Sequence, residues 1–191
     1  MNFTENKKFE KENYSESALE AGEYVECEFH FCDFSSSSLA GMKFDACTFV
    51  ECNLSLVKLS GTSFQDVTFN GCKMFGLHFE ECNPFGLSFT FNNCQLNHSS
   101  FYQLKMKKQH FSGCHLGEVD FTECELMEAK YSDCNLIGAR FENTNLIKAD
   151  LSTAVHYTID PTINRIKKAK FALSGIPGLL TTFDIVIDRN V

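Results

Sequence analysis

Residues 45–54 read DACTFVECNL, which is two five-residue units in succession. In each unit a small residue stands two positions before a large apolar one, Cys47 before Phe49 and Cys52 before Leu54. Two cysteines at this spacing are compatible with a metal site, a disulfide, redox chemistry or a structural repeat. The rest of the chain distinguishes these interpretations.

The large apolar residue of this unit recurs every five residues along most of the chain. One series runs from Phe9 to Phe89, and after a shift of two residues a second series runs from Phe91 to Leu151. Every member of both series is large and apolar or aromatic except Pro84. Because only 43% of all residues are hydrophobic, chance does not account for such a run. The chain is therefore built from an internal repeat, which indicates a solenoid or a related array.

A period of five fits neither an α-helix nor a continuous β-strand, whose faces repeat every ~3.6 and ~2 residues. It fits a chain that turns a corner every five residues, so that each short side directs one large and one small residue inward. Four sides close a square coil of about 20 residues, and coils stacked at about 4.8 Å can hydrogen-bond to one another. We therefore predict an all-β solenoid in which each coil packs only against its neighbours.

This square coil places side chains that are 20 residues apart above one another. Identical side chains at that spacing pack well, as in other axially repeated β structures. The predicted core columns are Phe9, Phe29, Phe49, Phe69 and Phe89 in the first series, and Phe101, Phe121 and Phe141 together with Leu96, Leu116 and Leu136 in the second.

The position two residues before each large residue is mostly small, and all ten cysteines of the chain lie there. No Cys-x-x-Cys motif occurs, and successive thiols come from different walls, which disfavours a metal site. Stacked Cβ atoms about 4.8 Å apart are also too distant for a disulfide, which needs about 3.8 Å. We predict that Cys47 and the other cysteines are buried free thiols that fill the core; a thiol-based metal or redox protein is the alternative. The predicted thiol columns are Cys32, Cys52 and Cys72 in the first series, and Cys94, Cys114 and Cys134 in the second.

Residues 134–151, CNLIGARFENTNLIKADL, resemble the repeat consensus A-(D/N)-L-x-x of the pentapeptide repeat family. The resemblance covers about residues 22–151 and implies a right-handed quadrilateral β-helix. Residues 1–21 have charged or polar residues in the small positions, so we expect degenerate repeats or an N-terminal cap there.

The frame slip at residues 84–91 interrupts the repeat. The segments MFGLHF and PFGLSF match at a spacing of ten, which predicts that Phe75 and Phe85 point outward from opposite sides. Two interpretations remain for this segment: a bulge that offsets the two parts of the rod, or a contact site.

Residues 152–191 lie beyond the repeat and are expected to cap the last coil, which would otherwise expose unpaired backbone groups. Ser174 and Pro177 predict the start of a short helix, and DIVID at 184–188 predicts a short strand. The apolar side chains of this tail exceed the needs of a small cap, so we expect them to join two chains in a twofold homodimer. The candidate dimer residues are Ile176, Leu179, Leu180, Phe183, Ile185 and Ile187.

Composition excludes several function classes. The net charge of −8 disfavours a protein that neutralises nucleic-acid phosphates, and it suits a basic partner. No apolar run is long enough for a membrane span, and the polar N-terminus is not a signal peptide, so we expect a cytoplasmic protein. The histidines fall in outward positions without a catalytic triad, and no phosphate-binding loop occurs. We therefore expect no enzyme activity, no cofactor and no metal.

Acidic residues gather within residues 118–133 at positions that point outward. Lys105 precedes Glu125 by 20 residues, and Lys108 precedes Glu128 by the same number. We therefore predict an ion pair between neighbouring coils for each of these two pairs. The candidate partner-binding residues are Glu118, Asp120, Glu123, Glu125, Glu128 and Asp133.

The tail and the acidic surface together resemble the quinolone-resistance (Qnr-type) branch of the pentapeptide repeat family. That resemblance implies a tail-to-tail homodimer that imitates DNA in shape and charge and binds DNA gyrase or topoisomerase IV. The long loops that project from many such rods are missing from this sequence. A general protein-interaction scaffold with another partner is the alternative function, because fold does not fix function.

Overall fold

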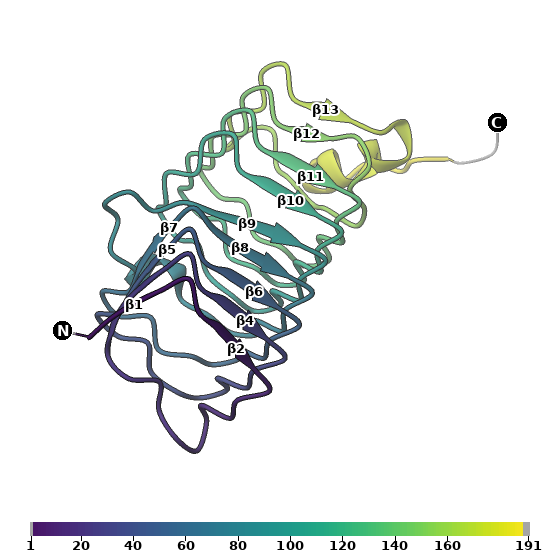
Figure 1. Cartoon of the computed structure of the whole chain (residues 1–191). Helices are drawn as coiled ribbons and strands as arrows, with labels where there is room; N and C mark the ends of the chain where they lie inside the picture. Colours follow the sequence, from purple (N-terminus) through teal and green to yellow (C-terminus); the bar gives the residue numbers. More distant parts are fainter. Residues whose placement is uncertain (1, 189–191) are drawn as a thin grey trace.

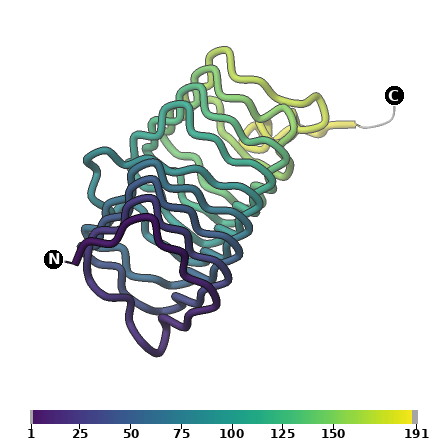
Figure 2. Tube along the Cα trace, viewed as in Figure 1, coloured from purple at the N-terminus to yellow at the C-terminus, as the bar shows by residue number. Residues whose placement is uncertain are grey.

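Parallel β-pairing between residues about 20 apart winds the chain into a rod (Figure 1). This computed structural model describes residues 2–188. The coils follow one another along a single axis, from the N-terminal coil to the C-terminal segment (Figure 2). The longest sheet forms one wall of the rod and contains nine parallel strands. In chain order they are β2 (Lys8–Glu10), β4 (Glu28–His30), β6 (Thr48–Val50), β8 (Val67–Asn70), β9 (Phe89–Asn92), β10 (His110–Ser112), β11 (Lys130–Ser132), β12 (Asp150–Leu151) and β13 (Lys170–Phe171).

A second parallel sheet forms the wall that precedes this one in each coil, and it stops after four strands. The remaining two walls are held by isolated parallel bridges, such as Asn53 with Lys73 and Asp120 with Arg140. The predicted right-handed quadrilateral β-helix is confirmed. The strands of the second sheet are β1 (Asn2–Glu5), β3 (Gly22–Val25), β5 (Lys43–Asp45) and β7 (Ser63–Gln65).

Each corner of the coil depends on a residue in the left-handed conformation, two positions after the large residue. Phe31 (φ 55°) and Glu51 (φ 51°) are examples. This conformation costs a residue other than glycine roughly 1–2 kcal/mol. The same residues donate their N–H groups to the next coil, Phe31 to the Val50 carbonyl at 2.9 Å and Glu51 to the Asn70 carbonyl at 2.8 Å. These hydrogen bonds offset the strain and join each corner to the coil above.

The large residues fill the rod as continuous stacks of rings. Phe29 lies between Phe9 and Phe49 with ring centroids 4.7 Å from each. The stack continues through Phe69 to Phe91, whose centroids are 5.5 Å apart. Stacking and edge contacts between such rings add stability beyond the burial of apolar area. The other predicted core residues, Leu96, Phe121, Phe141, Cys47, Cys52, Cys72 and Cys114, are also buried.

The predicted large position of Phe89 is wrong. Phe89 pairs with Val67 and Phe91 pairs with Phe69, so the strand spacing here is 22 residues and Phe89 occupies the small column. The coil before β9 contains two extra residues, which shift Phe89 from the position of a large residue to that of a small residue. Pro84 is exposed and places no side chain in the core. The Phe89 ring packs instead near Phe79, Phe91 and Phe101, with centroids 5.0 to 6.2 Å away.

The N-terminal residues form the first coil rather than a separate cap. β1 pairs with β3 and β2 pairs with β4 in the same register as the later coils. Phe9 and Tyr14 pack against the core but remain partly exposed, because no coil covers them from outside.

The coils continue beyond Leu151, the last residue of the fivefold series. β13 pairs with β12, and Ile159 is buried while Phe171 packs against the core. Only residues after 172 leave the coil, as the 3₁₀ helices η2 (Leu173–Leu179) and η3 (Thr181–Phe183). A third such helix, η1 (Phe79–Glu81), lies within a wall.

The predicted strand at residues 184–188 does not form. The chain turns at Asp184, which is left-handed at φ 48°, and residues 184–188 contain no strand. Pro177 lies inside η2, between Gly175 and Leu179, and all seven residues of this segment are of the 3₁₀ type.

Candidate interaction surface

The two halves of the chain differ in charge. Residues 1–95 contain fourteen Asp and Glu against six Lys and Arg, which is a net charge of −8. Residues 96–191 contain eleven of each, so their net charge is zero. The whole net charge of the protein therefore belongs to its N-terminal half, a division that charge counting along the sequence would have revealed.

The structure distributes the six predicted acidic residues around the rod instead of gathering them on one face. Glu118, Glu123, Glu128 and Asp133 occupy four successive corners of one coil, each in the left-handed conformation. Asp120 lies on a wall, where it bridges to Ser100 and Arg140, and Glu125 lies on the wall that follows. The set is a ring around the rod, and a partner docking on one side would meet only part of it.

Neighbouring coils supply partners to most of this ring. The partner is in each case 20 residues away, which confirms the predicted register. The contacts are Glu118 with His98 (3.3 Å), Asp120 with Arg140 (3.7 Å), Glu123 with Gln103 (2.7 Å), Glu125 with Asn145 (2.5 Å) and Glu128 with Lys148 (3.6 Å).

The two predicted ion pairs do not form. Glu125 and Glu128 turn to the coil that follows them, where Asn145 and Lys148 lie, and leave Lys105 and Lys108 without an ion pair within residues 2–188. The register is as predicted, since Lys105 bridges to Glu125 through the backbone. The prediction failed because each outward residue has one neighbour in the preceding coil and one in the following coil. The sequence does not show which of these two neighbours it contacts.

The N-terminal half leaves its acidic residues largely unneutralised. Its one ion pair between coils within residues 2–95 joins Lys43 to Glu23 at 3.8 Å. Exposed glutamates of this half that form no ion pair with any described residue are Glu5, Glu12, Glu16, Glu20, Glu26, Glu51 and Glu81. Such side chains keep their full charge towards a partner.

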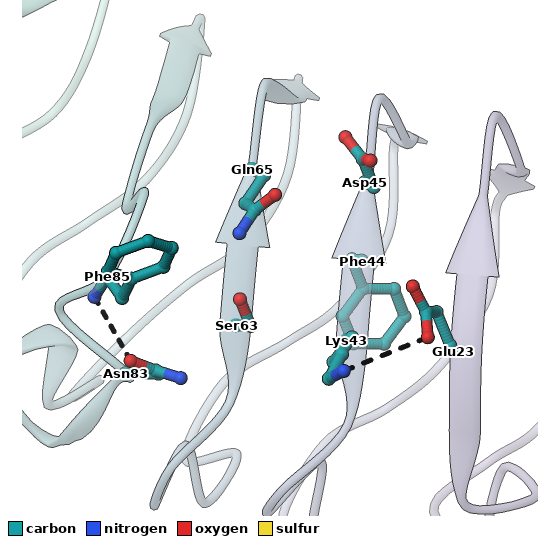
Figure 3. A pocket seen from close by; sticks show the side chains of 8 residues that line it. All are labelled: Glu23, Lys43, Phe44, Asp45, Ser63, Gln65, Asn83 and Phe85. Carbon is teal, nitrogen blue, oxygen red and sulfur yellow. Dashed lines mark hydrogen bonds and ion pairs between the residues drawn. The ribbon is translucent and has the colours of Figure 1, made fainter. Parts of the chain in front are cut away.

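The frame slip opens a shallow pocket beside the last strand of the second sheet (Figure 3). The pocket has a volume of about 310 Å³, and Lys43, Asp45, Gln65, Asn83 and Phe85 are among the residues that line it. Phe85 is 81% exposed, and its N–H donates to Asn83 Oδ1 at 3.0 Å. The predicted outward direction is thus correct for Phe85, whereas Phe75 is half-buried. A large exposed ring beside charged groups is a feature of contact sites.

The tail divides the six candidate dimer residues into two groups. Leu179 is buried and Ile176 packs against the core, so both close the end of the rod. Phe183, Ile185 and Ile187 are about half exposed, and Leu180 is half-buried. Sequence reasoning missed Leu173 and Val186, which are 88% and 97% exposed. We call the exposed apolar residues of the tail, Leu173, Phe183, Ile185, Val186 and Ile187, the apolar patch.

The cysteines are all free and buried. Burial raises the pKa of Cys47, Cys82 and Cys124 to about 12, which keeps these thiols protonated and unreactive at neutral pH. No group of three or more His, Cys, Asp or Glu side chains within residues 2–188 is arranged to hold a metal ion. No helix in this part of the chain is long and apolar enough to cross a membrane.

A family profile described as a pentapeptide repeat region matches residues 23–90 and 78–151. The chain belongs to the pentapeptide repeat family. No curated protein sequence matches it.

Solved structures are similar to this pentapeptide repeat protein at low sequence identity. A trypsin-treated form of QnrB1, a plasmid-mediated fluoroquinolone resistance protein, is similar with a TM-score of 0.50 and 17% identity, over 98% of this chain and 100% of QnrB1. HetL from the cyanobacterium Nostoc, a pentapeptide repeat protein involved in heterocyst differentiation regulation, matches with a TM-score of 0.48 and 11% identity, over 88% of this chain and 86% of HetL. At these identities the likeness to QnrB1 is one of fold.

Proposed function

We propose that this protein is a non-catalytic binding protein for a type II topoisomerase, DNA gyrase or topoisomerase IV, and that it acts in the cytoplasm by presenting an acidic rod in place of DNA. The observation that carries the proposal is the net charge of −8 confined to one half of a rod with the fold of QnrB1. Protection of the enzyme from fluoroquinolones is the corresponding effect in the cell.

Charge density supports this interpretation in magnitude. The N-terminal half contains five strands of the longer sheet, which at about 4.8 Å each span roughly 24 Å. Eight net negative charges over that length are about one per 3 Å, against one per ~1.7 Å of duplex DNA. The imitation is weaker than DNA, yet it is sufficient to steer the rod to a basic channel.

The unneutralised glutamates of the N-terminal half are the main contact surface in this proposal. The acidic ring at residues 118–133 extends that surface, with a field reduced by its partners in neighbouring coils. The exposed Phe85 at the frame slip adds an apolar anchor beside the acidic residues.

The exposed apolar patch of the tail is proposed to join two copies of the chain. A twofold contact there directs both acidic halves outward, so that one dimer presents two acidic arms. Light scattering tests this: the chain is expected to be a dimer, and Ile185→Asp with Val186→Asp is expected to give a monomer with unchanged circular dichroism. A monomeric unmodified chain contradicts the dimer.

A gyrase supercoiling assay, with and without a fluoroquinolone, tests the binding function. The unmodified chain is expected to inhibit supercoiling or to protect it from the drug. Glu16→Gln/Glu20→Gln/Glu26→Gln is expected to weaken the effect about tenfold through the lost field. Glu118→Gln/Glu123→Gln/Glu142→Gln removes the same number of charges from the other half, where the acidic ring only extends the main surface, and is expected to weaken the effect less.

Equal weakening by both triple variants assigns the effect to net charge alone and contradicts the proposed surface. No inhibition, no protection and no binding remove the topoisomerase function and leave an interaction scaffold for another partner.

A further inference from the structure

Six cysteines form one unbroken column on a single wall of the rod. The wider coil at the frame slip places Cys94 directly after Cys72, so the two predicted columns are continuous. Each of the six is at most 1% exposed. We name this column the cysteine ladder: Cys32, Cys52, Cys72, Cys94, Cys114 and Cys134.

A repeated hydrogen bond holds the thiols of the cysteine ladder in register. Each thiol donates to a backbone carbonyl in the coil before its own. The acceptor is the large residue of the preceding wall in that coil. Cys52 donates to Phe29 at 3.2 Å, Cys94 to Phe69 at 3.4 Å and Cys134 to Phe111 at 3.5 Å. Because the partner is equivalent in every coil, the sulfur atoms rise at the strand spacing of about 4.8 Å.

Neighbouring thiols of the ladder belong to segments of one wall that pair in register. Parallel bridges join Asn53 to Lys73, Lys73 to Gln95 and Gln95 to His115, and each of these residues directly follows a ladder cysteine. The ladder is therefore a continuous row of sulfur atoms, and not six separate core residues.

The spacing of this row fits a two-coordinate metal ion between adjacent sulfur atoms. Two metal–thiolate bonds of about 2.3 Å placed end to end span about 4.6 Å, close to the rise of about 4.8 Å per coil. A disulfide requires a much closer approach, with Cβ atoms about 3.8 Å apart. Zinc needs four ligands in a tetrahedron, and the described residues provide no group of three.

We propose that adjacent thiols of the cysteine ladder bind soft, two-coordinate metal ions, one ion for each pair of neighbours. Two S–H bonds release their protons to solvent, two metal–sulfur bonds form, and no electron is transferred. Thiolates select soft ions of this kind. Six thiols make three separate pairs, so the ladder holds up to three ions.

Charge favours a divalent ion over a monovalent one. Two thiolates with a divalent ion such as Hg²⁺ are neutral, whereas two thiolates with Ag⁺ keep one negative charge. The thiols of the ladder are buried, and carbonyl oxygens accept hydrogen bonds from them. A buried uncompensated charge is costly there. The proposal is independent of topoisomerase binding, since it concerns inward side chains only.

Two variants with equal numbers of thiols test the geometry. Cys52→Ala/Cys94→Ala/Cys134→Ala leaves three ladder thiols, none of which are neighbours. Cys94→Ala/Cys114→Ala/Cys134→Ala leaves three neighbouring thiols. Alanine suits the site, because Ala154 follows Cys134 in the same column and is buried. Both variants keep the four cysteines outside the ladder, which contribute equally to all proteins compared.

The measurement is a titration of the full chain with Hg²⁺ in the presence of a small monothiol competitor, followed by native mass spectrometry and ultraviolet charge-transfer absorption. The unmodified chain is expected to bind three more ions than the alternating variant, and the contiguous variant one more. Ag⁺ is expected to bind the unmodified chain more weakly than Hg²⁺.

Circular dichroism before and after metal addition is expected to remain unchanged. Equal binding by the alternating and contiguous variants would overturn the proposal, as would binding that appears only when the β-sheet signal is lost, because the thiols would then act outside the ladder. Since both variants carry three Cys→Ala changes, impaired folding affects the two alike and does not imitate the expected difference.

Discussion

Residues 2–95 and residues 96–172 form their coils with the same inward pattern but present different surfaces. The ring stack from Phe9 continues through Phe91 and Phe111 to Tyr131 without a break between the halves. Outside, the N-terminal half carries a net charge of −8 and the C-terminal half of the chain carries none. A solenoid thus separates the residues that fix the fold from those that are free to meet a partner.

The origin of the charge difference lies in the order of residues along each outward column. In the C-terminal half, acidic residues are followed 20 positions later by bases, as in Asp120 with Arg140 and Asp150 with Lys170. In the N-terminal half, Glu26 is followed by Ala46 and then by Asp66. Columns of this second kind gain no ion pairs and repel one another, so stability does not explain them. The proposed recognition of a basic partner would account for them.

Alkaline pH is expected to have the largest effect, and it should act mainly on the N-terminal half. Burial holds the pKa of Cys47, Cys82 and Cys124 at about 12 in the folded chain, above an ordinary value near 9. Their stabilising contribution is complete below pH 9 and is lost as the pH rises towards 12, because only the unfolded chain ionises these thiols. Each thiol contributes up to about 1.4 kcal/mol per pH unit in that window.

Two of these three thiols, Cys47 and Cys82, lie in residues 1–95, so amides of that half are expected to exchange first at pH 10. Urea denaturation at pH 8, 9 and 10 measures the slope. Cys47→Ala/Cys82→Ala should flatten it about twice as much as Cys124→Ala, and an identical slope in all three proteins would contradict the assignment to buried thiols.

Removal of one ring from the stack is expected to be the next largest effect and should be alike in both halves. Phe49 is fully buried, with its ring 4.7 Å from Phe29 and 5.1 Å from Phe69. Phe49→Ala should lower the free energy of unfolding by about 3–5 kcal/mol, and Leu116→Ala in the other half by about 2–5 kcal/mol. Phe85→Ala, at an exposed site, is the control and should change it by less than about 0.5 kcal/mol. Urea denaturation midpoints measure all three variants. An unchanged free energy of unfolding for Phe49→Ala would show that the rings do not hold the coils together.

The core could be predicted from sequence because a period of five has one geometric solution. Once four walls of five residues are accepted, the spacing of 20 fixes which residues stack, and Phe29 above Phe9 follows at once. The exception is Phe89, because a shift of two in the series does not reveal where in the coil the extra residues leave the wall. Exposure of Pro84 decides this, and exposure is a property of the folded loop.

The candidate surface was less predictable because outward residues obey no such rule. The sequence placed Glu118 and Glu128 outside and, through the period of five, at different corners, yet it could not show which neighbour each would contact. In the tail, hydrophobicity alone did not separate Leu179, which caps the rod, from Val186, which faces solvent. The distinction in the tail depends on the path of the chain after the repeat weakens.

Restoration of the frame at the junction of the two halves is expected to have a moderate effect. Deletion of Pro84 and Phe89 together places Phe85 five residues after Phe79 and Phe91 five residues later, with Ser88 in the small position. The second sheet, which stops at β7, should then continue and gain backbone hydrogen bonds worth about 1 kcal/mol each. We expect the free energy of unfolding to rise by about 1–2 kcal/mol in total.

Thermal denaturation followed by circular dichroism measures this change. Deletion of Pro84 alone is the control, since it brings Phe85 inward but leaves the following residues out of frame, and it should destabilise the rod. Equal destabilisation by the single and double deletions would show that the slip is required for folding and is not an insertion into a regular coil.

Loss of a single ion pair between coils is expected to have the smallest effect, and it compares the two halves most directly. Lys43 lies 3.8 Å from Glu23, and Lys148 lies 3.6 Å from Glu128, with the two lysine side chains 52% and 55% exposed. Lys43→Gln and Lys148→Gln should each cost less than about 1 kcal/mol at low salt.

Lys43→Gln should be the more costly of the two substitutions, because it removes one of only six bases from the half with a net charge of −8. Lys148 belongs to a half whose charges balance, so its loss adds little repulsion. In 1 M salt, where charges are screened beyond about 3 Å, the difference between the variants should vanish. Urea midpoints at low and high salt measure it. A difference that persists in 1 M salt would assign it to packing and would remove the electrostatic contrast between the two halves.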